Sequence, residues 1–139
     1  MSLYVLDTDM LTLVEEGHPE AARRFLEHRP EEVAITVISV EEQLSGWYTE
    51  VRQTKDAYKL AQAYKRLAAC VRFLADMEIL DFSESAIQRY QDLVKLKLKI
   101  GRTDLRIAAT ALEYGATVVT RNRRDFQQVP GLLVEDWSC

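Results

Sequence analysis

The stretch spanning residues 101–126, GRTDLRIAATALEYGATVVTRNRRDF, constrains the fold of this chain most. After Asp104, apolar and small residues recur at helical spacing, which predicts a helix that packs closely against a sheet. Gly115 suits the left-handed position that ends such a helix. Residues 116–120 are β-branched and nearly uncharged, as in a buried central strand, and a loop with three arginines and Asp125 follows them. The stretch therefore predicts a buried helix–strand unit with an aspartate near each end.

The rest of the chain alternates short apolar runs with helical patterns. The runs that predict strands are 3–6, 33–38, 78–82, 116–120 and 132–134. Helical patterns lie between them. The longest, over 55–76, is predicted to have one apolar face, formed by Tyr58, Ala61, Tyr64, Leu67, Val71 and Leu74. Strands that alternate with helices are typical of a three-layer α/β fold with a mostly parallel central sheet, here of about five strands flanked by helices.

Length and charge narrow the function classes. A chain of 139 residues favours a single domain over 1–139. Its net charge of −4 speaks against nonspecific binding to duplex nucleic acid, which needs a broad basic face. No apolar run approaches the roughly 20 residues of a membrane span, and the first residues lack the basic region of a signal peptide. We therefore expect a cytoplasmic protein without a membrane partner.

Acidic residues follow the predicted strands. Asp7 comes directly after the first strand, Glu42 shortly after the second and Asp125 after the fourth, while Asp104 begins a helix expected to face the same edge. In an open parallel sheet, ligands bind outside the carboxyl ends of the strands. Acids gathered there would repel one another without a cation among them, and an all-oxygen set favours Mg²⁺ or Mn²⁺.

Each acid also has a purely structural interpretation. Asp7 and Asp9 can cap the first helix, and Ser39 with Glu42 matches a capping box. Asp104 and Asp125 suit helix N-termini through the helix dipole. The spacing alone leaves the metal site and the capping roles both open.

Four motifs in order resemble the PIN domain, and more closely the PIN-domain ribonuclease toxins of VapBC-type toxin–antitoxin pairs. They are LDTD at 6–9, SVEEQLSG at 39–46, GRTDLRIAATA at 101–111, and TRNRRDF with the following VPGL at 120–132. The resemblance covers nearly the whole chain and is least diagnostic over about 47–78. It implies a PIN-like fold.

The resemblance also implies a set of site residues. Carried over by position, the catalytic and metal-binding acids are Asp7, Glu42, Asp104 and, less regularly, Asp125. The polar residues expected to support them are Thr8, Asp9, Thr120 and Asn122. The family commonly has Asn or Ser at position 9, so Asp9 either adds charge to the site or only caps the helix. Some members have an acid at position 122, which leaves the fourth ligand open between Asp125 and Asn122.

The activity that the resemblance implies is hydrolysis of RNA phosphodiester bonds, in tRNA or rRNA, with one or two Mg²⁺ or Mn²⁺ ions. Basic side chains expected to contact RNA phosphates are Lys99, Arg102, Arg121 and Arg123. The implied partners are the RNA substrate, a cognate antitoxin and a second copy of the chain in a homodimer. Two alternatives stay open: a PIN-fold module that contacts RNA or protein without catalysis, and a phosphatase of the DxD type with Asp7 as nucleophile.

Overall fold

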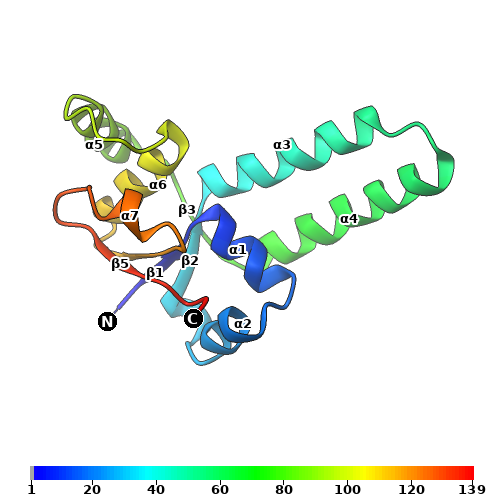
Figure 1. The fold of residues 1–139 in the computed structure, drawn as a ribbon, viewed down its shortest axis with the longest axis horizontal. Coiled ribbons are helices and arrows are strands. Elements are labelled where there is room, and N and C mark those ends of the chain that lie inside the picture. Colours follow the sequence, from blue (N-terminus) through cyan, green and yellow to red (C-terminus); the bar gives the residue numbers. More distant parts are fainter. Residues whose placement is uncertain (1) are drawn as a thin grey trace.

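The computed structural model describes residues 2–139 as five strands and seven α-helices arranged around one sheet (Figure 1). In chain order the elements are β1 (Tyr4–Leu6), α1 (Thr8–Glu15), α2 (Pro19–Leu26), the 3-10 helix η1 (Pro30–Glu32), β2 (Val33–Thr36), α3 (Val37–Gln53), α4 (Ala57–Ala75), β3 (Glu78–Leu80), α5 (Glu84–Val94), α6 (Arg102–Glu113), β4 (Thr117–Val119), α7 (Arg123–Phe126) and β5 (Leu133–Glu135).

The sheet has the strand order β3-β2-β1-β4-β5, and every neighbouring pair is parallel. The predicted mostly parallel sheet of five strands is therefore confirmed, with no antiparallel strand among the described residues. β5 lies at an edge, as predicted, and β1 lies at the centre between β2 and β4. The carboxyl ends of β1, β2 and β4 consequently meet at one edge of the sheet.

Two apolar layers cover the sheet because successive side chains of a strand point to opposite faces. Val5 and Val118 pack with residues of α5, α6 and α7 on one face. Leu6 and Val119 pack with residues of α1, α2 and α4 on the other. This alternation produces the predicted three-layer arrangement.

The second strand is shorter than its β-branched run suggests. The run 33–38 predicts a strand to Ile38, but β2 ends at Thr36 and α3 begins at Val37. Thr36 is the N-cap of α3, and its hydroxyl accepts a hydrogen bond of 3.2 Å from the backbone N–H of Ser39. Local capping thus overrides the strand preference of the last two residues.

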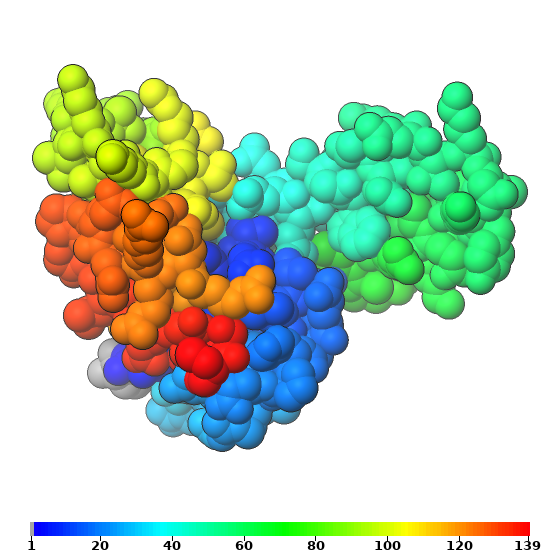
Figure 2. Space-filling view, in the orientation of Figure 1, coloured from blue at the N-terminus to red at the C-terminus, as the bar shows by residue number. Residues whose placement is uncertain are grey.

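Helices α3 and α4 form a hairpin that projects from the body of the molecule (Figures 1 and 2). The predicted apolar face of α4 is only partly correct. Leu74 is buried as predicted, whereas Tyr58 and Tyr64 are exposed, and the buried positions include Ala63 and Cys70. Because the hairpin projects, the outer part of α4 has no sheet to pack against.

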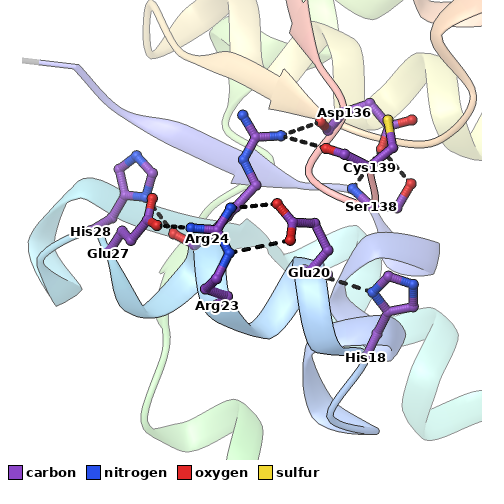
Figure 3. A network of polar contacts seen from close by, with 10 residues as sticks. His18, Glu20, Arg23, Arg24, Glu27, His28, Asp136, Ser138 and Cys139 are labelled. Carbon is purple, nitrogen blue, oxygen red and sulfur yellow. Dashed lines mark hydrogen bonds and ion pairs between the residues drawn. The ribbon is translucent and has the colours of Figure 1, made fainter.

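The C-terminal tail is anchored to α2 (Figure 3). Arg24 donates hydrogen bonds from Nη1 to the backbone carbonyls of Asp136, at 2.7 Å, and Cys139, at 3.2 Å. Trp137 is fully buried and stacks on His28, with 4.6 Å between the ring centroids. The chain end therefore completes the apolar layer beneath α1 and α2.

None of the helices in residues 2–139 combines the length and the apolar character needed to cross a membrane.

Candidate active site

The first acid, Asp7, lies where β1 ends and α1 begins, and it is 4% exposed. Its Oδ1 accepts a hydrogen bond of 2.8 Å from the backbone N–H of Met10, so Asp7 does cap α1. Its Oδ2 accepts a hydrogen bond of 2.5 Å from the hydroxyl of Thr120. Both oxygens are thereby fixed in orientation, and each retains lone-pair capacity for a further partner.

Thr120 is fully buried at the end of β4, next to β1 in the sheet. Its hydroxyl accepts a hydrogen bond of 2.8 Å from the backbone N–H of Asn122 while donating to Asp7. The accepted bond leaves the hydroxyl proton free to point at the carboxylate. Thr120 therefore contacts an acid directly, in the position expected of a supporting residue.

Glu42 reaches the same edge from the second turn of α3. The hydroxyl of Thr8 donates to Glu42 Oε1 and lies 2.8 Å from the hydroxyl of Ser39, which is fully buried. The prediction that Ser39 and Glu42 form a capping box is wrong, because Thr36 is the N-cap of this helix. The S-x-x-E spacing instead places both side chains on Thr8.

Asp104 lies in the first turn of α6, whose N-cap is Gly101 and has no side-chain cap. It is half-buried, and none of the side-chain hydrogen bonds described for residues 2–139 involves it. Its carboxylate is consequently held by helix geometry alone.

Asn122 and Asp125 lie next to each other around the short helix α7. The Asn122 amide donates a hydrogen bond of 2.8 Å to Asp125 Oδ2. Asn122 lines the same cleft as Asp7 and Asp104, whereas Asp125 does not. Asp125 therefore lies outside the lining of this cleft, although it is close enough to Asp104 to raise the pKa of that acid.

The remaining predicted polar residue, Asp9, also faces this cleft and forms an ion pair with Arg121, Nε to Oδ2, at 2.8 Å. The cleft has a volume of about 530 Å³. Its lining residues are Asp7, Thr8, Asp9, Thr12, Glu42, Asp104, Arg121 and Asn122. In Figure 2 the dark blue start of α1 lies at the centre of the face, bordered by the orange segment that follows β4 and the cyan start of α3.

The electrostatics of the cleft show uncompensated negative charge. Burial raises the pKa of Asp7 from its ordinary 3.8 to about 6, and Asp104 and Asp9 add to the rise. The hydrogen bonds from Thr120 and Met10 act in the opposite direction. The pKa of Asp104 is also raised, first by burial and then by Glu42, Asp125 and Asp9. Such mutual repulsion is relieved by a cation.

The donor set fits a hard divalent cation. Four carboxylates line one cleft together with hydroxyl and amide oxygens: Asp7 at the N-cap of α1, Asp9 in the first turn of α1, Glu42 on α3 and Asp104 on α6. No thiol or imidazole lies among the lining residues. Within residues 2–139, no three acidic, histidine or cysteine side chains already stand in a closed metal cluster.

The predicted basic residues divide into two groups. Arg121 lines the acidic cleft, and Lys99 lines a neighbouring cleft of about 480 Å³. Arg102 and Arg123 are exposed and line neither. The second cleft also contains Arg124, which the sequence pattern did not single out, together with Asn122, Asp125 and Gln128.

Comparison with known proteins identifies the family. The family model described as PIN domain matches residues 4–132 of the chain. This chain belongs to the PIN-domain family. The resemblance seen in the four motifs is therefore confirmed.

Similar proteins agree with this assignment over their whole lengths. Ribonuclease VapC2 of Rickettsia felis is 30% identical over 142 residues, which cover 98% of each chain. The tRNA(fMet)-specific endonuclease VapC of Salmonella typhimurium is 29% identical, with 99% of each chain covered. Among solved structures, VapBC2 from Rickettsia felis bound to a DNA fragment from their promoter superposes with a TM-score of 0.72 at 31% identity, covering 97% of this chain and 98% of that one.

Proposed function

We propose that this PIN domain is a metal-dependent endoribonuclease that hydrolyses RNA phosphodiester bonds. The observation that carries the proposal is the convergence of Asp7, Glu42 and Asp104 on one cleft, from the N-cap of α1, from α3 and from α6. The uncompensated charge of two of these acids supports it. Relatives named as VapC ribonucleases, similar over the whole chain, point to RNA as the substrate.

The proposed cofactor is Mg²⁺ or Mn²⁺, as one or two ions held by Asp7, Glu42 and Asp104. When bound, such ions activate a water molecule and stabilise the leaving oxygen of the phosphodiester. The chain's own contribution is orientation: Thr120 aims the Asp7 carboxylate, and Thr8 holds Glu42. We assign Asn122 to the cleft itself and Asp125 to the orientation of the Asn122 amide.

The RNA strand is proposed to run from the acidic cleft into the neighbouring one. The two clefts share Asn122, and the second offers the cations Lys99 and Arg124 for a flanking phosphate. The Gln128 side chain fixes the backbone of Lys99 at this cleft, because its Oε1 accepts from the Lys99 backbone N–H and its Nε2 donates to the Lys99 backbone carbonyl, each at 2.9 Å. Arg102 and Arg123, which are exposed nearby, are assigned to more distant phosphates.

The proposed biological setting is a toxin–antitoxin pair. Solved structures similar to this chain include VapBC complexes, among them those of Rickettsia felis and Salmonella typhimurium. We infer that the protein partner is a small cognate antitoxin and that the chain assembles as a homodimer. The unit that makes both contacts is a single PIN domain over residues 1–139.

The proposal is tested by incubating purified protein with total tRNA and rRNA in Mg²⁺ or Mn²⁺, and in EDTA. We expect discrete fragments only with the metal, carrying 5′-phosphate and 3′-hydroxyl ends, because water is the attacking group and the 3′ oxygen leaves. Glu42→Gln should abolish them, whereas Glu41→Gln, the exposed neighbouring acid, should cut like the wild type. Fragments that persist in EDTA, or that end in cyclic phosphates, would refute a metal-dependent hydrolysis in this cleft.

A further inference from the structure

One acid of the cleft differs from the others in having a cationic partner. Arg121 forms two hydrogen bonds to Asp9, from Nε to Oδ2 at 2.8 Å and from Nη2 to Oδ1 at 3.0 Å. Both carboxylate oxygens of Asp9 are therefore occupied in a bidentate pair. Among the ion pairs formed within residues 2–139, this is the only one whose two members both line the acidic cleft.

The backbone places this pair beside the acids that we assign to the cation. Asp9 lies two residues after Asp7 in the first turn of α1, and Arg121 follows Thr120 at the end of the adjacent strand β4. Thr120 and Arg121 thus contact Asp7 and Asp9 respectively. Asp9 also lies within electrostatic reach of Asp104, whose pKa it raises.

The pair is too exposed to matter much for folding. The side chains of Arg121 and Asp9 are 50% and 53% exposed, and ion pairs in such positions contribute little to stability. Its main effect is therefore on the charge of the cleft that it borders, because Arg121 neutralises the negative charge of Asp9.

We propose that Arg121 withholds Asp9 from the cation and thereby sets how tightly the cleft binds a divalent ion. In this account Asp7, Glu42 and Asp104 are the ligands, and Asp9 with Arg121 acts as a neutral pair at the rim. Arg121 is a positioning residue that acts through Asp9. The inference rests on the proposed function, since it concerns the metal of that same cleft.

The experiment is a titration of the full chain with Mn²⁺, followed by calorimetry, which needs no RNA cleavage. The variants are Arg121→Gln, Asp9→Asn, the double variant and Asp104→Asn, which lacks a proposed ligand. Arg72→Gln removes the same charge from an exposed arginine of α4 that lines neither cleft, and it serves as the matched control. Far-UV circular dichroism checks that each variant is folded.

The expected effects are opposite and cancel. Arg121→Gln frees a carboxylate and should tighten Mn²⁺ binding about three- to tenfold, whereas Asp9→Asn leaves Arg121 uncompensated and should weaken binding by a similar factor. The double variant removes a neutral pair and should bind within about twofold of the wild type. Arg72→Gln should stay close to the wild type.

Three results would overturn the inference. If the double variant binds Mn²⁺ as weakly as Asp9→Asn does, Asp9 is a direct ligand of the cation. If Arg121→Gln binds Mn²⁺ with the wild-type affinity, Arg121 does not control the affinity of the cleft. A wild-type chain that binds no Mn²⁺ would overturn the proposed metal site as well. If only the proposed role of the Arg121–Asp9 pair is wrong, the wild type still binds Mn²⁺ and Asp104→Asn does not.

Discussion

At the scale of single residues, the cleft pairs each acid with a different kind of neighbour. Asp7 is buried and receives hydrogen bonds from Thr120 and Met10, whereas Glu42 is exposed and receives one from Thr8. The ionised form of Asp7 is costly, since burial raises its pKa to about 6. A carboxylate kept in such a place without a cation lowers the stability of the fold.

This cost predicts a pH dependence of stability in the metal-free protein. The folded state holds the Asp7 proton more tightly than the unfolded state does, because its pKa rises from 3.8 to about 6. The stabilisation is therefore fully present below about pH 4 and is lost as the pH rises to about 6, a change on the order of 3 kcal/mol. Asp7→Asn should remove this part of the slope and be more stable than the wild type at pH 7.

The measurement is urea denaturation in EDTA between pH 4 and 8. Asp56→Asn is the matched control, because Asp56 caps α4 from an exposed position and should retain the wild-type slope. Parallel pH profiles for Asp7→Asn and the wild type would show that burial of Asp7 carries no such cost.

Sequence reasoning found most of these residues but not their contacts. Asp7, Glu42 and Asp104 line one cleft as the motifs predict, whereas the S-x-x-E spacing predicts a helix-capping role for Ser39 that the structure does not show. Its hydroxyl instead faces Thr8, 31 positions away in the chain. A sequence pattern shows local spacing, and a contact between two helices that follow different strands depends on the register of the sheet.

At the scale of elements, short-range signals predicted most helix and strand positions. Ser83 caps α5 and Gly115 adopts a φ of 65° after α6, as their residue types indicate. The errors fall where tertiary packing decides the outcome. The predicted apolar face of α4 is only partly buried because much of the α3–α4 hairpin lies away from the sheet, which leaves Tyr58 73% exposed.

The C-terminal tail is an element whose importance the sequence hardly suggests. Trp137 is fully buried and contacts both Tyr4 and His28, although the strand before it is short and at the edge. We expect Trp137→Ala to lower the free energy of unfolding by about 3–5 kcal/mol. Trp47→Ala, at a partly buried position on α3, should cost clearly less.

Chemical denaturation of both variants by fluorescence and circular dichroism checks this ranking. Equal losses for the two tryptophans, or a negligible loss for Trp137→Ala, would contradict the assignment of the tail to the core.

At the scale of the whole molecule, an acidic chain is proposed to act on a polyanion. The net charge is −4, but the acids of the cleft come from elements far apart in the sequence and meet only because β1 lies between β2 and β4. The resemblance predicted this family and fold correctly. The division of the basic side chains between two clefts, and the pairing of Arg121 with Asp9, depend on long-range side-chain placement that no motif records.

The central claim is that the carboxylates of this cleft catalyse RNA hydrolysis with a divalent cation. It is tested most directly by single-turnover cleavage of tRNA in saturating Mg²⁺ by the wild type, Asp104→Asn and Asp92→Asn. Asp92 is an exposed aspartate of α5 outside the cleft, so its variant controls for the chemical change. We predict that Asp104→Asn folds normally and cuts about a hundredfold more slowly or worse, with Asp92→Asn unchanged. A folded Asp104→Asn that cuts tRNA at the wild-type rate would contradict the account.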